Sequence, residues 1–201
     1  RQMCIRDRLI NDGTYVDQNS TPFLVEGNAR SILATERLVL NTMQRMSGIA
    51  TMTNNLKNKI KSFKSVILDT RKTTPNFRYP EKWAVKIGGG ENHRMGLFDA
   101  IMIKDNHIDY SENIENVLKK TETYLQKNSK RKIFVVVEVR DIVEIDNILK
   151  FSWIDRILLD NMNLNELKKA VRLIDGKIKT EASGDINKDN IIDVAKTGVD
   201  Y

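Results

Sequence analysis

Short apolar runs alternate with helical patterns along most of the chain. Each run is apolar at consecutive positions and rich in β-branched residues, which is typical of a strand buried on both faces in a parallel sheet. Amphipathic segments separate the runs, so that a run and a helix recur at intervals of about 20 to 35 residues. The pattern predicts an α/β fold, either a β/α barrel or a doubly wound sheet. The five runs are 65–70, 99–105, 133–139, 154–161 and 176–183.

A long helical pattern precedes the first of these runs. Residues 23–25 form a short apolar run and residues 26–28 resemble a turn. Apolar residues then recur at helical spacing from Ile32 to Met52. Gly48 lies inside this pattern, and we expect a helix break there, which gives one or two helices.

Two later helices have recognisable ends. Asn163 precedes a helical segment and Glu166 follows three residues later, which is the spacing of a capping box. The segment "PEKWAVKI" is followed by three glycines, beginning at Gly88. No GxGxxG or Walker pattern accompanies these glycines. We therefore expect them to end the helix and bend the chain towards His93 and Arg94, not to bind phosphate.

Polar side chains stand where each apolar run ends. Because the carboxyl ends of the strands in a β/α barrel face one side, these groups are expected to converge on one mouth. One such residue is more often a surface charge, but five strand ends in register favour an active site. The groups are Asp69 with Thr70, Arg71 and Lys72; Lys104 with Asp105 and Asn106; Glu138; Asp160 with Asn161; and Glu181 with Ser183.

Basic residues dominate the predicted mouth. Arg presents a planar fork that matches two carboxylate or phosphate oxygens, whereas Lys supplies a mobile point charge. A mouth with both types indicates a substrate with several negative groups. His93 is interpreted as a hydrogen-bond donor beside Arg94, because two histidines 14 residues apart, His93 and His107, give no zinc motif. The basic candidates are Arg71, Lys72, His93, Arg94 and Lys104.

Two acidic residues and one loop complete the candidate chemistry. Glu138 and Asp160 could serve as general acid and base, or could hold a Mg²⁺ ion carried by phosphates, and the basic mouth favours the second. Salt bridges from these acids to Arg71 or Lys104 are compatible with either. The backbone of the "EASGD" segment, at Ser183 and Gly184, could bind a phosphate before the next helix.

Composition excludes several classes of protein. The 201-residue chain has a net charge of +6, but its Lys and Arg are scattered among 27 acidic residues, which argues against a nucleic-acid-binding module. No apolar run approaches the roughly 20 residues that cross a bilayer, and the N-terminus lacks the order of a signal peptide. We expect a cytoplasmic protein without a membrane partner. The single cysteine, Cys4, precludes an intramolecular disulfide.

The first eight residues, "RQMCIRDR", do not continue the pattern of the rest. They match the translation of a common sequencing-library adaptor. Our hypothesis is that residues 1–8 are not native, and an independent genomic clone that encodes them would contradict it.

Six motifs in this order and spacing closely resemble the quinolinate phosphoribosyltransferase family, the decarboxylating nicotinate-nucleotide pyrophosphorylases of NAD synthesis. The resemblance covers about residues 11–201, and the long third motif is highly specific. The motifs are "NTMQRMSGIAT", "DTRKTTPNFR", "EKWAVKIGGGENHRMGLFDAIMIKDNH", "VVVEV", "ILLDNM" and "EASGDI".

The resemblance implies a type II phosphoribosyltransferase fold and its reaction. Residues 9–47 would be the end of an N-terminal α/β open sandwich domain, and residues 48–201 an incomplete β/α barrel, truncated at its C-terminus. The implied enzyme joins quinolinate to phosphoribosyl pyrophosphate with Mg²⁺, gives nicotinate mononucleotide, pyrophosphate and CO₂, and works as a homodimer or a larger homo-oligomer.

The resemblance also assigns roles to individual residues. Ser183 and Gly184 match the loop that meets the cosubstrate phosphates, and Glu138 and Asp160 match acids on the ribose and metal side. Lys72 and Lys104 match lysines between the two substrates, and we expect Lys104, Glu138 and Asp160 to be catalytic. The implied dicarboxylate site comprises Thr70, Arg71, His93 and Arg94, with Arg37 reaching the neighbouring subunit's site.

The chain departs from the family pattern in two respects. Asp185 stands where the family often has a second glycine, and a carboxylate beside a phosphate is unfavourable unless it points away. The chain also lacks the last barrel strands and most of the sandwich domain, so we expect the 201 residues alone to be poorly stable and inactive.

Three other interpretations compete with this one. A homologue of the molybdenum-transport-associated kind would share the fold and use another acceptor. A basic binding module would explain the charge but not the polar strand ends. A catalytically inactive scaffold would tolerate Arg94→Ala and Asp160→Ala.

Overall fold

The computed structural model describes residues 5–128 and 133–201. Its N-terminal part is an antiparallel pair, β1 (Ile5–Arg8) and β2 (Phe23–Glu26), followed by the long helix α1 (Ala29–Lys59). Asn28 begins α1, because its side chain accepts hydrogen bonds from two backbone N–H groups of the first turn. The hypothesis that residues 1–8 are not native stays a prediction. Residues 1–4 lie outside the described residues, and the rest of that segment forms β1.

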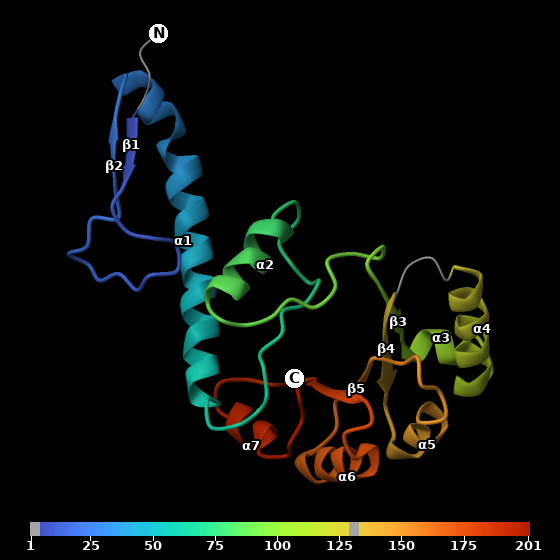
Figure 1. Cartoon of the computed structure of the whole chain (residues 1–201). Helices are drawn as coiled ribbons and strands as arrows, with labels where there is room; N and C mark the ends of the chain where they lie inside the picture. Colours follow the sequence, from blue (N-terminus) through green and yellow to red (C-terminus); the bar gives the residue numbers. More distant parts are fainter. Residues whose placement is uncertain (1–4, 129–132) are drawn as a thin grey trace.

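The predicted helix break at Gly48 is wrong, because α1 continues through this residue. The helix runs for 31 residues through that glycine. A single interior glycine costs a helix only about 1 kcal/mol, which the flanking helical turns and their packing outweigh. The C-terminal half of α1 packs against α2 (Arg78–Ile87), whereas its N-terminal half projects away from the barrel (Figure 1).

Four of the five predicted strands form one parallel sheet in the order β3-β4-β5-β6. The helices α3 (Asp105–Asp109) and α4 (Ile114–Lys127) follow β3. The short turn η1 (Ile142–Glu144) and α5 (Ile145–Ile148) follow β4, α6 (Leu164–Ile174) follows β5, and α7 (Ile191–Ala195) follows β6. The strands are β3 (Ala100–Ile103), β4 (Phe134–Val139), β5 (Arg156–Asp160) and β6 (Lys179–Ser183).

The fifth predicted strand, 65–70, forms only an isolated bridge between Leu68 and Glu91. The backbone of this segment pairs with each of its two neighbouring segments over too few residues to form a regular strand. Backbone hydrogen bonds nevertheless join Val66 to Asp200, and Tyr201 to Thr180 of β6. These bonds curve the sheet round, and the result is a partial β/α barrel preceded by an N-terminal unit.

The two faces of the sheet have opposite character. Alternate residues such as Val137, Ile157 and Leu159 are fully buried against the helices. Because successive side chains of a strand point to opposite faces, the remaining positions point inwards. The register therefore gathers polar residues on the inner face, namely Glu138, Arg156, Asp160, Glu181 and Ser183.

The two predicted helix ends are confirmed. Asn163 and Glu166 form a reciprocal capping box at the start of α6. Helix α2 ends at Ile87, and Gly88 follows as its cap. A side chain at Gly88 would collide with the Ala50 carbonyl of α1, so glycine there lets the two helices approach closely.

Within residues 5–128 and 133–201, none of the helices combines the length and the apolar character that crossing a bilayer requires.

Candidate functional site

The carboxyl ends of β3, β4 and β5 bring a lysine and two acids together. Lys104 Nζ lies 3.8 Å from Glu138 Oε2. Burial raises the pKa of Glu138, Lys104 acts to lower it, and the negative charge of Asp160 raises it again. The two acids are thus close enough to repel each other, and a cation between them would relieve that repulsion.

The end of β6 joins this group through Ser183. Its hydroxyl donates to Asp160 Oδ1, 2.5 Å away. The next residue, Gly184, is left-handed with φ of +91°, and a side chain there would collide with the Asn161 side chain. Asp185 is also left-handed, with φ of +50°. Ser183 and Gly184 therefore sit beside the acidic pair.

A second group of site residues comprises Arg71 and Arg94. Burial lowers the pKa of Arg94, and the nearby charge of Arg71 lowers it further. Two neighbouring guanidinium groups offer hydrogen-bond donors to an anion, and the Asp99 carboxylate is close enough to Arg94 to offset part of its charge. Arg78 of α2 holds their segments together, because it donates to the carbonyls of Arg71 and Met95, at 3.3 and 3.2 Å.

His93 lies between Arg94 and the inner face of the barrel. Its Nδ1 accepts the backbone N–H of Arg94 at 2.7 Å, and its Nε2 lies 3.4 Å from Glu181 Oε2. Glu181 also accepts from Arg156 Nη1 at 2.9 Å. Burial would raise the pKa of Glu181, but its contacts with His93 and Arg156 outweigh that effect and hold the pKa below its usual range.

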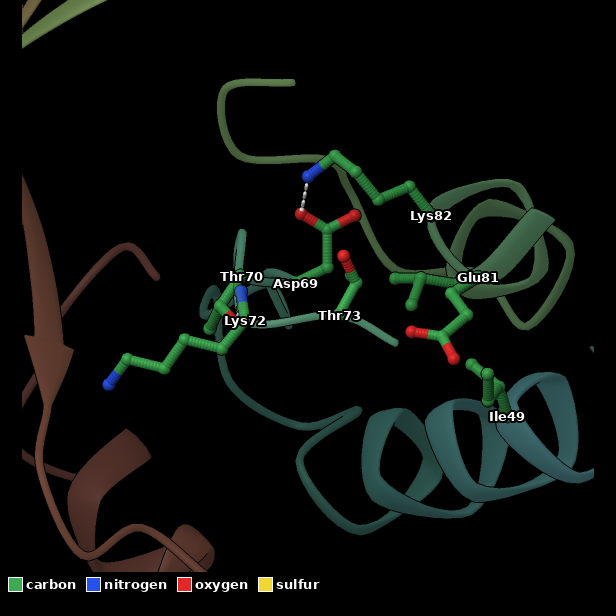
Figure 2. A pocket seen from close by; sticks show the side chains of 8 residues that line it. Ile49, Asp69, Thr70, Lys72, Thr73, Glu81 and Lys82 are labelled. Carbon is green, nitrogen blue, oxygen red and sulfur yellow. Dashed lines mark hydrogen bonds and ion pairs between the residues drawn. The ribbon is translucent and has the colours of Figure 1, made fainter. Parts of the chain in front are cut away.

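The carboxylate of Asp69 contacts both the helix that carries Lys82 and the segment that carries His93. Lys82 is 1% exposed and donates to Asp69, as the dashed line in Figure 2 shows. Asp69 also accepts from Asn92 Nδ2 at 2.7 Å and from the backbone N–H of His93 at 2.9 Å. Burial raises the pKa of Asp69, and Lys82 and His93 oppose that effect. Asp69 therefore connects the segment of Arg71 to that of His93, and its carboxylate is buried and hydrogen-bonded to these groups.

A cavity of about 160 Å³ lies beside this buried pair. Figure 2 shows the Lys72 side chain extending away from Lys82, and Glu81 beside helix α1. Arg45 of α1 lies 2.6 Å from Glu81 and connects that helix to the cavity wall. The lining residues are Ile49, Asp69, Thr70, Lys72, Thr73, Glu81, Lys82 and Val85.

Arg37 lies apart from these residues. It belongs to the N-terminal half of α1, its side chain is 76% exposed, and its charged contact is Glu36 at 3.8 Å.

Sequence reasoning missed Lys82, Asn92 and Arg156. Lys82 lies inside an amphipathic helix, where a lysine is normally exposed, and Asn92 lies in a glycine-rich loop. Arg156 begins a buried strand, where its guanidinium stacks 3.9 Å from the Tyr201 ring centroid. In the sequence, Arg156 is marked only as a charged residue directly before the apolar residues 157–159.

Comparison with known proteins finds one family along nearly the whole chain. The family model of the quinolinate phosphoribosyl transferase C-terminal domain matches residues 49–201, and that of the N-terminal domain matches residues 3–47. A mitochondrial quinolinate phosphoribosyltransferase (decarboxylating) of Nicotiana tabacum is 44% identical over 96% of this chain. A chloroplastic nicotinate-nucleotide pyrophosphorylase (carboxylating) of Oryza sativa subsp. japonica is 44% identical over 95% of it.

A solved structure supports the same fold. The nicotinate-nucleotide pyrophosphorylase from Francisella tularensis matches 98% of this chain with a TM-score of 0.90 and 41% identity, and 68% of its own chain is covered. The chain spans 58% of the Nicotiana tabacum relative and 54% of the Oryza sativa relative. The two family models meet inside α1, near Gly48.

Proposed function

Because the chain belongs to the quinolinate phosphoribosyltransferase family, we propose that it transfers the phosphoribosyl group of phosphoribosyl pyrophosphate to quinolinate. The second carboxylate of quinolinate leaves as CO₂, and the products are nicotinate mononucleotide and pyrophosphate. One observation carries the proposal, namely that Arg71 and Arg94, whose segments are joined by the hydrogen bonds of Arg78, lie in the same barrel as the Lys104, Glu138 and Asp160 cluster. The two arginines suit a dicarboxylate, and the lysine with the two acids suits a ribose that carries phosphates.

The arginine pair is the proposed dicarboxylate site. Each guanidinium fork can bind one carboxylate through two parallel hydrogen bonds, and the repulsion between the forks is relieved when a dianion binds. Thr70, Lys72 and His93 border this site, and Arg37 would be contributed across the interface of a homodimer or a larger homo-oligomer.

The acidic cluster is the proposed ribose and metal side. Carboxylate oxygens are ligands that Mg²⁺ accepts, and the mutual repulsion of Glu138 and Asp160 fits a cation between them. No group of three or more His, Cys, Asp or Glu that could hold a metal occurs among the described residues. The proposed ion would therefore take its other ligands from phosphates and water. Ser183 and Gly184 would meet the phosphates of the cosubstrate.

The proposed mechanism is positioning with charge stabilisation. Mg²⁺, when bound with the cosubstrate, offsets the charge of the departing pyrophosphate. Lys104 adds a positive charge between the substrates, and Glu138 or Asp160 stabilises positive character at the anomeric carbon while the pyridine nitrogen attacks. Loss of CO₂ then leaves a carbanion beside the quaternised nitrogen, which stabilises it until a proton is added. The arginines retain the remaining carboxylate.

Substrate choice tests the proposal in the full-length protein that contains this chain. Quinolinate and nicotinate are each incubated with phosphoribosyl pyrophosphate, with Mg²⁺ or with EDTA, and the nucleotide product and CO₂ are measured. We expect turnover only with quinolinate and Mg²⁺. Equal use of nicotinate would contradict a dicarboxylate site, and inactivity with both acceptors would favour a homologue with another acceptor.

Two variants separate an enzyme from an inactive scaffold. Arg94→Met and Asp160→Asn should each lower kcat/KM by about 100-fold, because each removes a charged partner of a substrate. Glu115→Gln removes an exposed carboxylate that is paired with Lys119 on α4, and serves as the control. Unchanged activity in both variants would overturn the proposed roles.

The cytoplasmic location predicted from the sequence stays a proposal. The names of the Nicotiana tabacum and Oryza sativa relatives place those proteins in mitochondria and chloroplasts. Fluorescence microscopy of the tagged full-length protein would test it.

A further inference from the structure

Both ring nitrogens of His93 face protein groups. Nδ1 accepts the backbone N–H of Arg94 at 2.7 Å, so it carries a lone pair and no proton. The proton of the neutral ring must then lie on Nε2. That nitrogen is shielded from solvent, makes no full hydrogen bond within the described part of the chain, and lies 3.4 Å from Glu181 Oε2. An acceptor at this position favours a proton on Nε2.

Glu181 is itself held by Arg156. Arg156 Nη1 donates at 2.9 Å to the same Oε2 atom that faces His93. The Arg156 guanidinium is packed against the rings of Phe134 and Tyr201, at 5.1 and 3.9 Å from their centroids. Side chains of Arg156, Glu181 and His93 are all about nine-tenths buried. A buried charge pair of this kind is sensitive to the loss of either partner, because the other charge is then left uncompensated.

We propose that Arg156 and Glu181 are positioning residues for the dicarboxylate site, acting through the Nε2–H tautomer of His93 on Arg94. Arg156 fixes the Glu181 carboxylate, Glu181 fixes the proton on Nε2, and Nδ1 is then free to accept the N–H of Arg94. The backbone of Arg94 is thereby held while its side chain lies beside Arg71. This inference rests on the proposed function and adds two residues to it.

The tautomer can be read directly by NMR. The chain contains two histidines, so ¹⁵N-histidine labelling of the full-length protein gives two imidazole patterns from this region, and His107→Gln identifies one of them. His107 is a matched internal control, because its Nδ1 accepts the Lys104 N–H at 2.9 Å while the residue is exposed. We expect His93 to be protonated on Nε2 alone, and Glu181→Leu to disturb that pattern. A proton on His93 Nδ1 would overturn the proposal.

Kinetics give the second measurement. Glu181→Gln and Arg156→Met in the full-length protein should raise KM for quinolinate about tenfold, with KM for phosphoribosyl pyrophosphate and kcat within about twofold of wild type. Arg156→Lys keeps the charge but loses the fork, and should have an intermediate effect. Glu115→Gln is the matched control.

The outcomes separate this proposal from its alternatives. A merely structural role would lower thermal stability and reduce the active fraction, so kcat would fall while both KM values stayed unchanged. That result, or an unchanged KM for quinolinate, would overturn the positioning role. If the wild-type protein does not use quinolinate at all, the proposed function fails, whereas the tautomer is still decided by NMR.

Discussion

The loop after β6 contains two consecutive residues in the left-handed region, Gly184 and Asp185. The first must be glycine, because a side chain would collide with Asn161 in addition to the backbone strain. The second is an aspartate, one of the few other residue types that tolerate this conformation. Successive backbone N–H groups in a tight turn are one way in which a protein forms a concave anion site. Substitutions at Gly184 and at Asp185 can therefore test the backbone conformation of this loop separately from its charge.

Gly184→Ala should lower the free energy of unfolding by about 2 kcal/mol, because it adds a clash to the strain of a left-handed alanine. It should also raise KM for phosphoribosyl pyrophosphate. Denaturation and steady-state kinetics measure the two effects. Gly176→Ala is the control, since Gly176 has φ of +70° but open space around it. Equal destabilisation of the two variants would show that the Asn161 contact contributes nothing.

Asp185→Gly should lower KM for phosphoribosyl pyrophosphate about threefold or more, because it removes a negative charge beside the proposed phosphate site. Asp175→Gly is a close match, since Asp175 caps α6 with φ of +49° and lies on another loop. Both variants relieve the same backbone strain, so their stabilities should change alike. A KM that stays the same in Asp185→Gly means that the carboxylate points away from the phosphates.

At the scale of elements, hydrophobic pattern and turn chemistry predicted four strands and the capping box of α6, because these depend on local sequence. Two predictions were wrong. The predicted break at Gly48 was wrong because the low helix propensity of one glycine costs less free energy than the tertiary contacts of the helix contribute. The strand at 65–70 was wrong because the extent of pairing depends on its partners, residues 91 and 200, which are distant in sequence.

Gly48→Ala should raise the free energy of unfolding by about 1 kcal/mol. The glycine is helical, and an added Cβ would meet no other atom within 4 Å. Gly88→Ala provides the contrast, because its Cβ would collide with the Ala50 carbonyl and should destabilise the protein. Urea denaturation of both variants measures the difference. A destabilised Gly48→Ala would indicate that another surface packs on this part of α1 in solution.

At the scale of the whole molecule, the sequence predicted which residue types reach the barrel mouth but not how the barrel is held together. Lys104, Glu138, Asp160 and Ser183 end neighbouring strands, so strand order alone brought them together. The contact between Arg156 and Glu181 spans 25 residues of sequence, and that between His93 and Glu181 joins a loop before β3 to β6. Contacts of this kind depend on register and closure, which a local pattern does not contain.

Asp200 connects the first segment of the barrel domain along the chain to its last strand, β6. Its carboxylate accepts from Lys64, Lys179 and the backbone N–H and hydroxyl of Thr180. Burial would raise the pKa of Asp200, but these hydrogen bonds outweigh it and lower the pKa from 3.8 to about 2. The ionised form is therefore the one that stabilises the folded barrel, and it brings together segments that are 136 residues apart.

The stabilisation by Asp200 should depend on pH in a defined direction. Because the folded pKa is depressed, the contribution is complete above the unfolded pKa and is lost as pH falls through the folded pKa, between about pH 4 and pH 2. The shift corresponds to at most roughly 2 to 3 kcal/mol, and solvent screening of the exposed lysines reduces this to about 1 kcal/mol. Asp200→Asn should thus destabilise the protein by about that amount at pH 7 and progressively less below pH 4. Denaturation across this range, with the exposed Asp193→Asn as control, measures the difference, and a difference that stays constant down to pH 2 would show that Asp200 acts through its shape and not through its charge.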